Sequence, residues 1–309
     1  MFLAILLLLA GAAVLYAGAE AAVRGAAGLA RVTGISAFTL GALLFGVDLE
    51  GTGAAIVASA QGEPALATGE IFGTVVFLFS AAFGAALLFS NEPVPAPDAV
   101  MIVAPALHLI AGALVISDRF VSRLEGGLLV ALYLSYVVLV VRYAPEARHR
   151  AHELELRIPG RTLPLRSAGL TVGGLVVIAG GATALVVGAA RLVAETNLAA
   201  GFVGAAILGV LVSLDEVLLE ILPIRRGTPD LATGNLFGTL AAFTSGVLGV
   251  AALVRPLDLD GASATAFLAA AVLYAVVASV FLVRREAWRG TGAGILALYV
   301  VWLLLSARI

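Results

Sequence analysis

The chain has 309 residues, of which 61% are hydrophobic and 12% are charged, with a formal net charge of −2 and a mean hydropathy of +1.10. This composition lies far outside the range of soluble domains and indicates an integral membrane protein. Because the sequence has no cysteine, disulfides, thiol chemistry and thiolate metal sites are excluded.

Ten apolar segments recur along the chain, and most are long enough to cross a hydrocarbon layer that needs about 20 helical residues. In chain order they are 2–19, 36–60, 67–91, 99–117, 126–144, 167–190, 199–223, 231–254, 263–283 and 290–307. They are too long for β-barrel strands, which would show about ten alternating residues. We therefore predict an all-α integral membrane protein with ten transmembrane helices. The first segment lacks a positively charged leader, so we expect a retained span and not a secretory signal.

An internal duplication is visible in the sequence. Pro64–Thr74 (PALATGEIFGT) and Pro229–Thr239 (PDLATGNLFGT) lie 165 positions apart and share eight of eleven residues. The one long polar connection, from about Arg142 to Ser167, separates five segments from five. Since five is odd, the second half must insert upside down relative to the first.

We therefore predict two inverted five-helix repeats joined by a cytoplasmic linker. The predicted units are 1–144, with its repeat motif at 45–78, then the linker 145–166, and 167–309, with its repeat motif at 208–243. Most of the 18 basic residues fall in the loops after the odd-numbered segments. Because cytoplasmic loops carry an excess of arginine, the loops after the odd-numbered segments are predicted to be cytoplasmic. Both termini are therefore expected outside. We expect a multi-pass protein of a prokaryotic cell membrane.

Six acidic residues fall inside the predicted spans, and no basic residue lies at comparable depth. They are Asp48, Glu50, Glu70, Asp215, Glu216 and Glu220. A charge at mid-bilayer costs about 2.5–3.5 kcal/mol even on the insertion scale, so such acids mark ion pathways. Hard oxygen ligands in this number suit Ca²⁺, which takes 6–8 oxygens, better than a soft transition metal.

The spacing of the polar residues predicts one shared site. Ser213, Glu216 and Glu220 follow i, i+3, i+7, which predicts one face of a helix. The 165-residue offset matches Asp48 with Ser213, Glu50 with Asp215, Gly51 with Glu216 and Glu70 with Asn235. The predicted metal site comprises Asp48, Glu50, Glu70, Ser213, Asp215, Glu216 and Asn235.

Glycines near these acids are predicted to shape the site. Gly46, Gly51 and Gly53 are expected to let the second span unwind and offer backbone carbonyls. Two pairs four residues apart, Gly69 with Gly73 and Gly234 with Gly238, predict close helix packing.

Other polar residues receive structural interpretations. His108 is predicted to be a packed or hydrogen-bonded core histidine. Glu20 and Arg24 are predicted to form an interfacial pair, and Asp258 and Asp260 to lie in a solvated loop.

Several of these motifs together resemble the sodium/calcium exchanger family. They are GVDLEG (46–51), GEP (62–64), GEIFGT (69–74), VSLDE (212–216) and GNLFGT (234–239). The family's site glutamate falls on Glu216 in the second repeat but on Gly51 in the first, with Glu50 one place earlier. The resemblance implies an antiporter that exchanges Ca²⁺ for Na⁺ by alternating access through a central carboxylate-lined site. It also implies that the first and sixth spans slide against the rest.

Two alternatives stay open: an H⁺-coupled Ca²⁺ or cation exchanger, and a degenerate homologue that does not transport. An enzyme is disfavoured because no Gly-x-Ser-x-Gly, His-Glu-x-x-His or phosphate-binding loop occurs in the sequence. We expect no cofactor beyond the transported Ca²⁺, Na⁺ or H⁺. The lipid bilayer and these cations are the expected partners, with no nucleic acid and no protein partner, and the chain is expected to act as a monomer.

Overall fold

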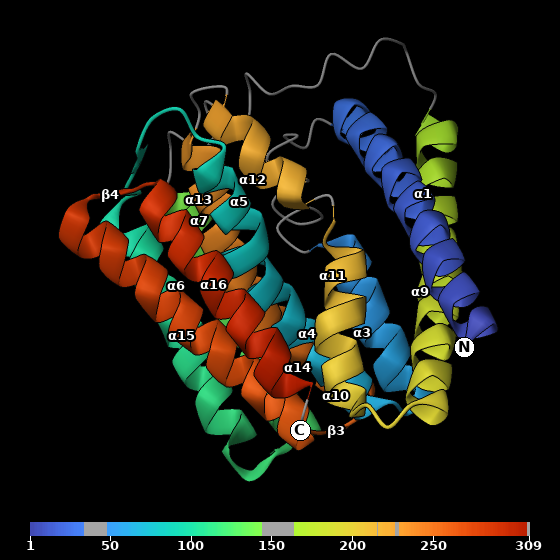
Figure 1. Cartoon of the computed structure of the whole chain (residues 1–309). Helices are drawn as coiled ribbons and strands as arrows, with labels where there is room; N and C mark the ends of the chain where they lie inside the picture. The colour runs from blue at the N-terminus through green and yellow to red at the C-terminus, as the bar shows by residue number, and fades with distance from the viewer. Residues whose placement is uncertain (34–47, 144–163, 215, 226–228, 308–309) are drawn as a thin grey trace.

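A computed structural model describes residues 1–33, 48–143, 164–214, 216–225 and 229–307. This part of the chain is helical apart from turns and four two-residue strands (Figure 1). The helices are α1 (Phe2–Thr33), α3 (Leu49–Gln61), α4 (Pro64–Phe77), α5 (Phe83–Leu88), α6 (Ala99–Val115), α7 (Arg123–Tyr143), α9 (Pro164–Glu195), α10 (Ala200–Val203), α11 (Gly209–Val212), α12 (Glu216–Arg225), α13 (Pro229–Ala241), α14 (Leu248–Val254), α15 (Gly261–Arg284) and α16 (Arg289–Ser306). Shorter turns are the π-helical η1 (Leu78–Ala82), η3 (Gly204–Leu208) and η4 (Ala242–Val247), and the 3₁₀ turn η2 (Ile116–Asp118).

Within the described residues, seven helical stretches are long and apolar enough to cross a membrane. A bent pair, Ala200–Val212 with Glu216–Arg225, would make an eighth. The chain is therefore an all-helical, multi-pass membrane protein. The remaining predicted spans correspond to α7 and to a segment that ends in α3, of which residues 34–47 lie outside the described part. The first predicted span, 2–19, agrees with the candidate span Phe2–Ala22, and the helix that contains it continues to Thr33.

Two helical stretches form the centre of the molecule, and both contain a copy of the repeated motif. The windows Pro64–Leu88 and Ala232–Val254 are 83% and 78% buried, whereas the other five candidate spans are 22–44% buried. Each stretch is interrupted by a π-helical turn, η1 or η4, at nearly equivalent positions of the repeat. π-turns of this kind occur often at functional sites.

Aromatic rings pack these two stretches against each other and against α15. Phe79 in η1 meets Phe237 in α13 edge-on at 5.9 Å between ring centroids. Tyr274 in α15 contacts both rings, at 6.2 and 6.1 Å. Edge-to-face pairs of this kind add about 0.5–1.5 kcal/mol beyond the burial of their area. The core of the protein therefore lies between α4 and α13.

The four short strands connect loops that are far apart in the sequence. β1 (Val94–Pro95) pairs antiparallel with β4 (Glu286–Ala287), and β2 (Phe120–Val121) pairs antiparallel with β3 (Leu257–Asp258). Figure 1 places β4 and β3 at opposite ends of the molecule. Each pairing joins a loop of the first 143 residues to a loop near the C-terminus.

The backbone beside each strand pair repeats the same arrangement. Arg119 and Arg285 end their helices in the left-handed conformation, with φ of 64° and 61°. Each then accepts a hydrogen bond on its carbonyl oxygen, from Leu259 N at 2.9 Å and from Ala96 N at 2.8 Å respectively. The same combination of a strand pair and a neighbouring backbone hydrogen bond therefore joins two loops at each end of the molecule.

Close packing of α4 was predicted from its glycines, and the structure confirms it. A Cβ on Gly69 or Gly73 would overlap the backbone of Gly201 or Ala205, so α4 touches α10 and η3. At Gly234 and Gly238 no atom of the described residues lies within 4 Å of such a Cβ. Close packing at that second pair stays a prediction.

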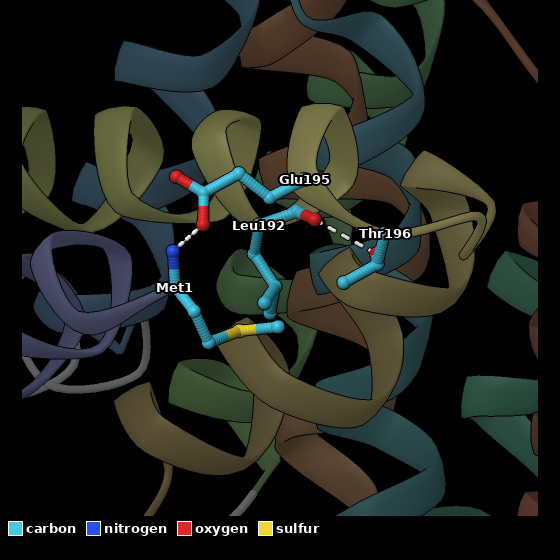
Figure 2. Close-up of polar contacts among 4 residues, drawn as sticks. All are labelled: Met1, Leu192, Glu195 and Thr196. Atoms are coloured by element: carbon cyan, nitrogen blue, oxygen red, sulfur yellow. Dashed lines mark hydrogen bonds and ion pairs between the residues drawn. The ribbon is translucent and has the colours of Figure 1, made fainter.

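Helices α1 and α9 lie side by side along one flank of the molecule (Figure 1). Glycines spaced by seven line the contact on both helices; they are Gly11, Gly18 and Gly25 on α1, and Gly174, Gly181 and Gly188 on α9. A Cβ on Gly181 would lie 2.5 Å from Leu15 N, so backbone touches backbone there. At the end of the pair the N-terminal amine of Met1 contacts Glu195, beside the bond from Thr196 Oγ1 to Leu192 O at 2.7 Å (Figure 2).

Substitution of these glycines should separate the two helices. We predict that Gly181→Val lowers the melting temperature of the detergent-solubilised protein, because overpacking costs about 1–3 kcal/mol. Gly180→Val is the matched control, since a Cβ at that neighbouring position would have no atom of another described segment within 4 Å. Thermal unfolding followed by tryptophan fluorescence measures both variants. Equal melting temperatures for the two would contradict the backbone contact.

Candidate cation site

Glu70 lies in the middle of α4, where every residue from Leu66 to Phe77 is buried. Its side chain is 0% exposed. Thr74, one turn later, donates from Oγ1 to Glu70 Oε1 at 3.3 Å, and Ser213 Oγ donates to Thr74 Oγ1 at 3.2 Å. Glu70 Oε2 has no hydrogen-bond partner among the described residues. A buried carboxylate oxygen without a partner is costly, which indicates a place for a cation or a proton.

Asp48 brings a second carboxylate to the same place. It is the N-cap of α3, and its Oδ1 accepts a hydrogen bond from Gly51 N at 2.9 Å. A Cβ placed on Gly51 would lie 2.8 Å from Asp48 Oδ2 and 2.9 Å from Glu70 Oε1. Both carboxylates therefore reach the same point beside Gly51. We call Asp48, Gly51, Glu70, Thr74 and Ser213 the Gly51 cluster.

A second group of acids surrounds Asn235 on α13. Asn235 Nδ2 donates to Glu216 Oε2 at 2.5 Å and to Glu220 Oε1 at 3.3 Å. The two glutamates are one turn apart on α12, so a single amide can bridge them. Glu220 is 0% exposed, and its Oε2 has no hydrogen-bond partner within the described part of the chain. We call Glu216, Glu220 and Asn235 the Asn235 cluster.

The predicted continuous face through Ser213, Glu216 and Glu220 was wrong at Ser213. The helix is interrupted after Val212, and the two parts, Ala200–Val212 and Glu216–Arg225, are bent by 50°. Ser213 therefore points to Thr74, whereas Glu216 and Glu220 point to Asn235. The backbone joins the two clusters at this break, where Glu216 N donates to Ser213 O at 3.2 Å.

Tyr16 of α1 binds the backbone on both sides of that break. Its hydroxyl donates to Leu211 O at 2.8 Å and accepts from Leu214 N at 3.0 Å. These bonds cap the end of α11, where helical carbonyl and amide groups lose their own partners. A side chain of the flanking α1–α9 pair is thus in contact with the segment that leads into Glu216.

The remaining predicted site residues have different outcomes. Asp215 lies outside the described residues, as does Gly46. Glu50 is half-buried in the first turn of α3 and leaves that helix about 100° around its axis from Gly51. The expectation that Gly51 and Gly53 unwind the second span was wrong, because α3 is continuous from Leu49 to Gln61.

No group of three or more acidic or histidine side chains in the described ranges is close enough to hold a metal ion by itself. The carboxylates are instead divided between the Gly51 cluster and the Asn235 cluster. An ion held here would also need hydroxyl, amide or backbone oxygens, which Ser213, Thr74 and Asn235 supply.

Three contact residues were not selected from the sequence. Thr74 is part of the repeated motif, but only the fold reveals that it links Glu70 to Ser213. Glu220 could have been chosen because it lies four residues after Glu216 on α12. Tyr16 carries no signal in the sequence, since its partners are about 195 residues away.

Two of the other polar predictions are confirmed and one needs correction. His108 is buried and its Nδ1 lies 2.7 Å from Ser245 Oγ, as expected for a hydrogen-bonded core histidine. Glu20 and Arg24 form an exposed ion pair. Asp260 is more than a solvated loop residue, because it caps α15 and accepts from Gly201 N at 2.8 Å.

Comparison with known proteins identifies a matching family and several similar membrane proteins. The family described as sodium/calcium exchanger protein matches residues 3–142 and 166–308. The inner membrane protein YrbG of Escherichia coli (strain K12) is 28% identical over 319 residues, covering 98% of this chain and 96% of that protein. The solved sodium-calcium exchanger NCX_Mj, soaked with Na⁺ and Sr²⁺, has a TM-score of 0.61 at 22% identity, with 98% of each chain covered. The H⁺/Ca²⁺ exchanger CAX has a TM-score of 0.75 at 14% identity, covering 99% of this chain and 87% of that one.

The two solved structures share the fold of this chain, and the family match extends over both halves and stops only at the polar connection between them. The duplicated motif, the buried acids on central helices and this match agree. The chain belongs to the sodium/calcium exchanger family of membrane cation exchangers.

Proposed function

We propose that the protein is an antiporter that exchanges Ca²⁺ for Na⁺ by alternating access. The observation that carries the proposal is the complete burial of Glu70 and Glu220, neither of which has an ion-pair partner among the described residues. Charge at this depth is costly unless it is neutralised, and a transported cation provides the neutralising charge. The exchangers NCX_Mj and CAX, which share the fold, support the same class of activity.

The proposed ligands are the site residues predicted from the sequence, together with two residues that the structure adds to them. Glu70, Asp48 and Glu216 provide carboxylate oxygens, Ser213 a hydroxyl, and Asn235 an amide oxygen once its side chain turns over. Glu220 and Thr74 join them through the contacts described above. Glu50 and Asp215 remain proposed ligands from the sequence. This set offers the 6–8 oxygens that Ca²⁺ prefers, and no cofactor is required.

Ten helices in two inverted halves would present this site to each side of the membrane in turn. The nearly equivalent π-turns η1 and η4 and the matching strand pairs at opposite ends support the inversion. In this proposal α1 and α9 slide along the rest, and both termini face outward, with the linker in the cytoplasm. Tyr16 then transmits the position of α1 to the break before Glu216.

Proton coupling is the second candidate, and the Asn235 cluster favours it. Glu216 and Glu220 are held by one amide, and two carboxylates so close can share a proton in place of a metal ion.

The test is Ca²⁺ uptake by proteoliposomes under an imposed Na⁺ gradient or an imposed pH gradient. Uptake driven by Na⁺ supports the first proposal, and uptake driven only by pH replaces it with the second. Folded protein that is silent under both gradients, also with other cations, would leave the non-transporting alternative.

Neutralisation of Glu216 should stop exchange. We predict that Glu216→Gln abolishes Ca²⁺ uptake while the protein still folds, because the amide keeps the volume and the contact with Asn235 but loses the charge. The control is Glu20→Gln, which removes an acid from an exposed pair on α1 and should leave uptake unchanged. Normal uptake by Glu216→Gln would remove the central claim.

Removal of the Tyr16 hydroxyl should slow exchange without removing the ion site. Tyr16→Phe loses two hydrogen bonds, each with a net worth of about 0.5–1.5 kcal/mol. We expect a several-fold lower maximal uptake rate at unchanged Ca²⁺ affinity in proteoliposomes. Tyr274→Phe is the matched control, because it also removes a tyrosine bond to a backbone carbonyl, that of Ile102, away from the break. Equal rates in the two variants would show that Tyr16 only stabilises the fold.

A further inference from the structure

Besides the acids Asp48 and Glu50 at the start of α3, the two halves of the chain differ in which helix carries the glutamate at one matched pair of repeat positions. In the second half, Glu216 on α12 faces Asn235 on α13, and the two side chains are in contact at 2.5 Å. The repeat offset places Gly51 at the position of Glu216 and Glu70 at the position of Asn235. The first half therefore has no side chain where the second has its glutamate, and a glutamate where the second has its asparagine.

The geometry at Gly51 explains how the first half keeps a carboxylate. Glu70 Oε1 lies 2.9 Å from the position that a Cβ on Gly51 would take. The carboxylate from α4 thus enters the space that a side chain from α3 would otherwise occupy. Glu70 is fully buried there, and its Oε2 has no hydrogen-bond partner within the described residues.

We propose that Gly51 and Glu70 are an exchanged pair: at these matched positions the first half carries its glutamate on α4 instead of α3, and the absence of a side chain at Gly51 leaves room for it. The cation-binding role of this carboxylate rests on the proposed function. Its placement has a consequence for the site, because α4 is continuous and buried through Glu70 whereas α12 begins at Glu216, directly after a break. In this proposal the ion contacts two different kinds of carboxylate. Glu70, from the first half, lies inside a continuous helix, whereas Glu216, from the second half, lies at the start of a separate helix.

The test moves the carboxylate back. Glu70→Asn should lower Ca²⁺ uptake and Ca²⁺ affinity by about tenfold or more, the scale on which metal sites respond to loss of a supporting group. Gly51→Glu alone should also lower uptake, because its side chain meets Phe243, Asp48 and Glu70. The double variant Gly51→Glu with Glu70→Asn should recover most of the loss. The matched control, Gly51→Gln with Glu70→Asn, has the same shape without the charge and should not recover.

A double variant that folds but transports no better than Glu70→Asn would overturn the proposal. So would equal recovery by the Gln control, since it would show that volume and not charge was restored.

A second readout does not depend on transport. In ion-free detergent solution Gly51→Glu should lower the melting temperature, and adding Glu70→Asn should restore much of it, because a shorter side chain leaves the shared space. Strictly additive shifts would mean that residues 51 and 70 do not compete for one position, and would overturn the proposal. If the wild-type protein binds and moves no cation, the proposed function fails, and this coupling still decides whether the pair is exchanged.

Discussion

Burial of acidic side chains that have no ion-pair partner among the described residues is the constraint on which the architecture depends. Glu70 and Glu220 are fully buried, and the helices around them must provide hydroxyl, amide and backbone groups in place of water. Among the candidate spans in the described residues, the two most buried are accordingly the ones that carry Glu70 and Asn235. The break before Glu216 and the π-turns that follow the motif helices lie in the same central region. Glu216 and Glu220 thus follow a helix break, whereas Glu70 lies inside the continuous helix α4.

The two clusters differ in what holds them. In the Gly51 cluster, Thr74 links Glu70 of α4 to Ser213, and Asp48 at the start of α3 meets Glu70 beside Gly51. In the Asn235 cluster a single amide bridges two acids on one helix. The repeat has therefore kept its backbone plan while its chemistry has diverged. Such divergence can separate the roles of the halves, with one set of oxygens held by a continuous helix and the other placed next to a joint. If both sets bind the transported ion, as proposed, ion selectivity and coupling depend on how the two sets differ.

Much of the architecture was accessible from hydrophobic patterning. The segments predicted at 99–117 and 263–283 correspond closely to α6 and α15, and the repeated motif identified the two central helices. Polar burial at Glu70, Ser213 and Glu216 followed from the same repeat. The bend at Ser213, the π-turns and the reach of Tyr16 could not be predicted, because each depends on contacts between residues far apart in the sequence. Gly51 is the clearest case: its residue type, next to the acids, suggested a point where the helix unwinds, whereas its surroundings are set by side chains from α4 and η4.

The small strand pairs have a consequence for how the protein is made. Val94 in β1 and Val121 in β2 are both buried, and their partners β4 and β3 are synthesised more than 130 residues later. Until then, Ala96 N has no access to the carbonyl of Arg285 that it finally binds. The loops on either side of α6 therefore lack their strand partners while most of the chain is being inserted. The strands next to α15 and α16 therefore supply the pairing partners of two loops in the first half of the chain.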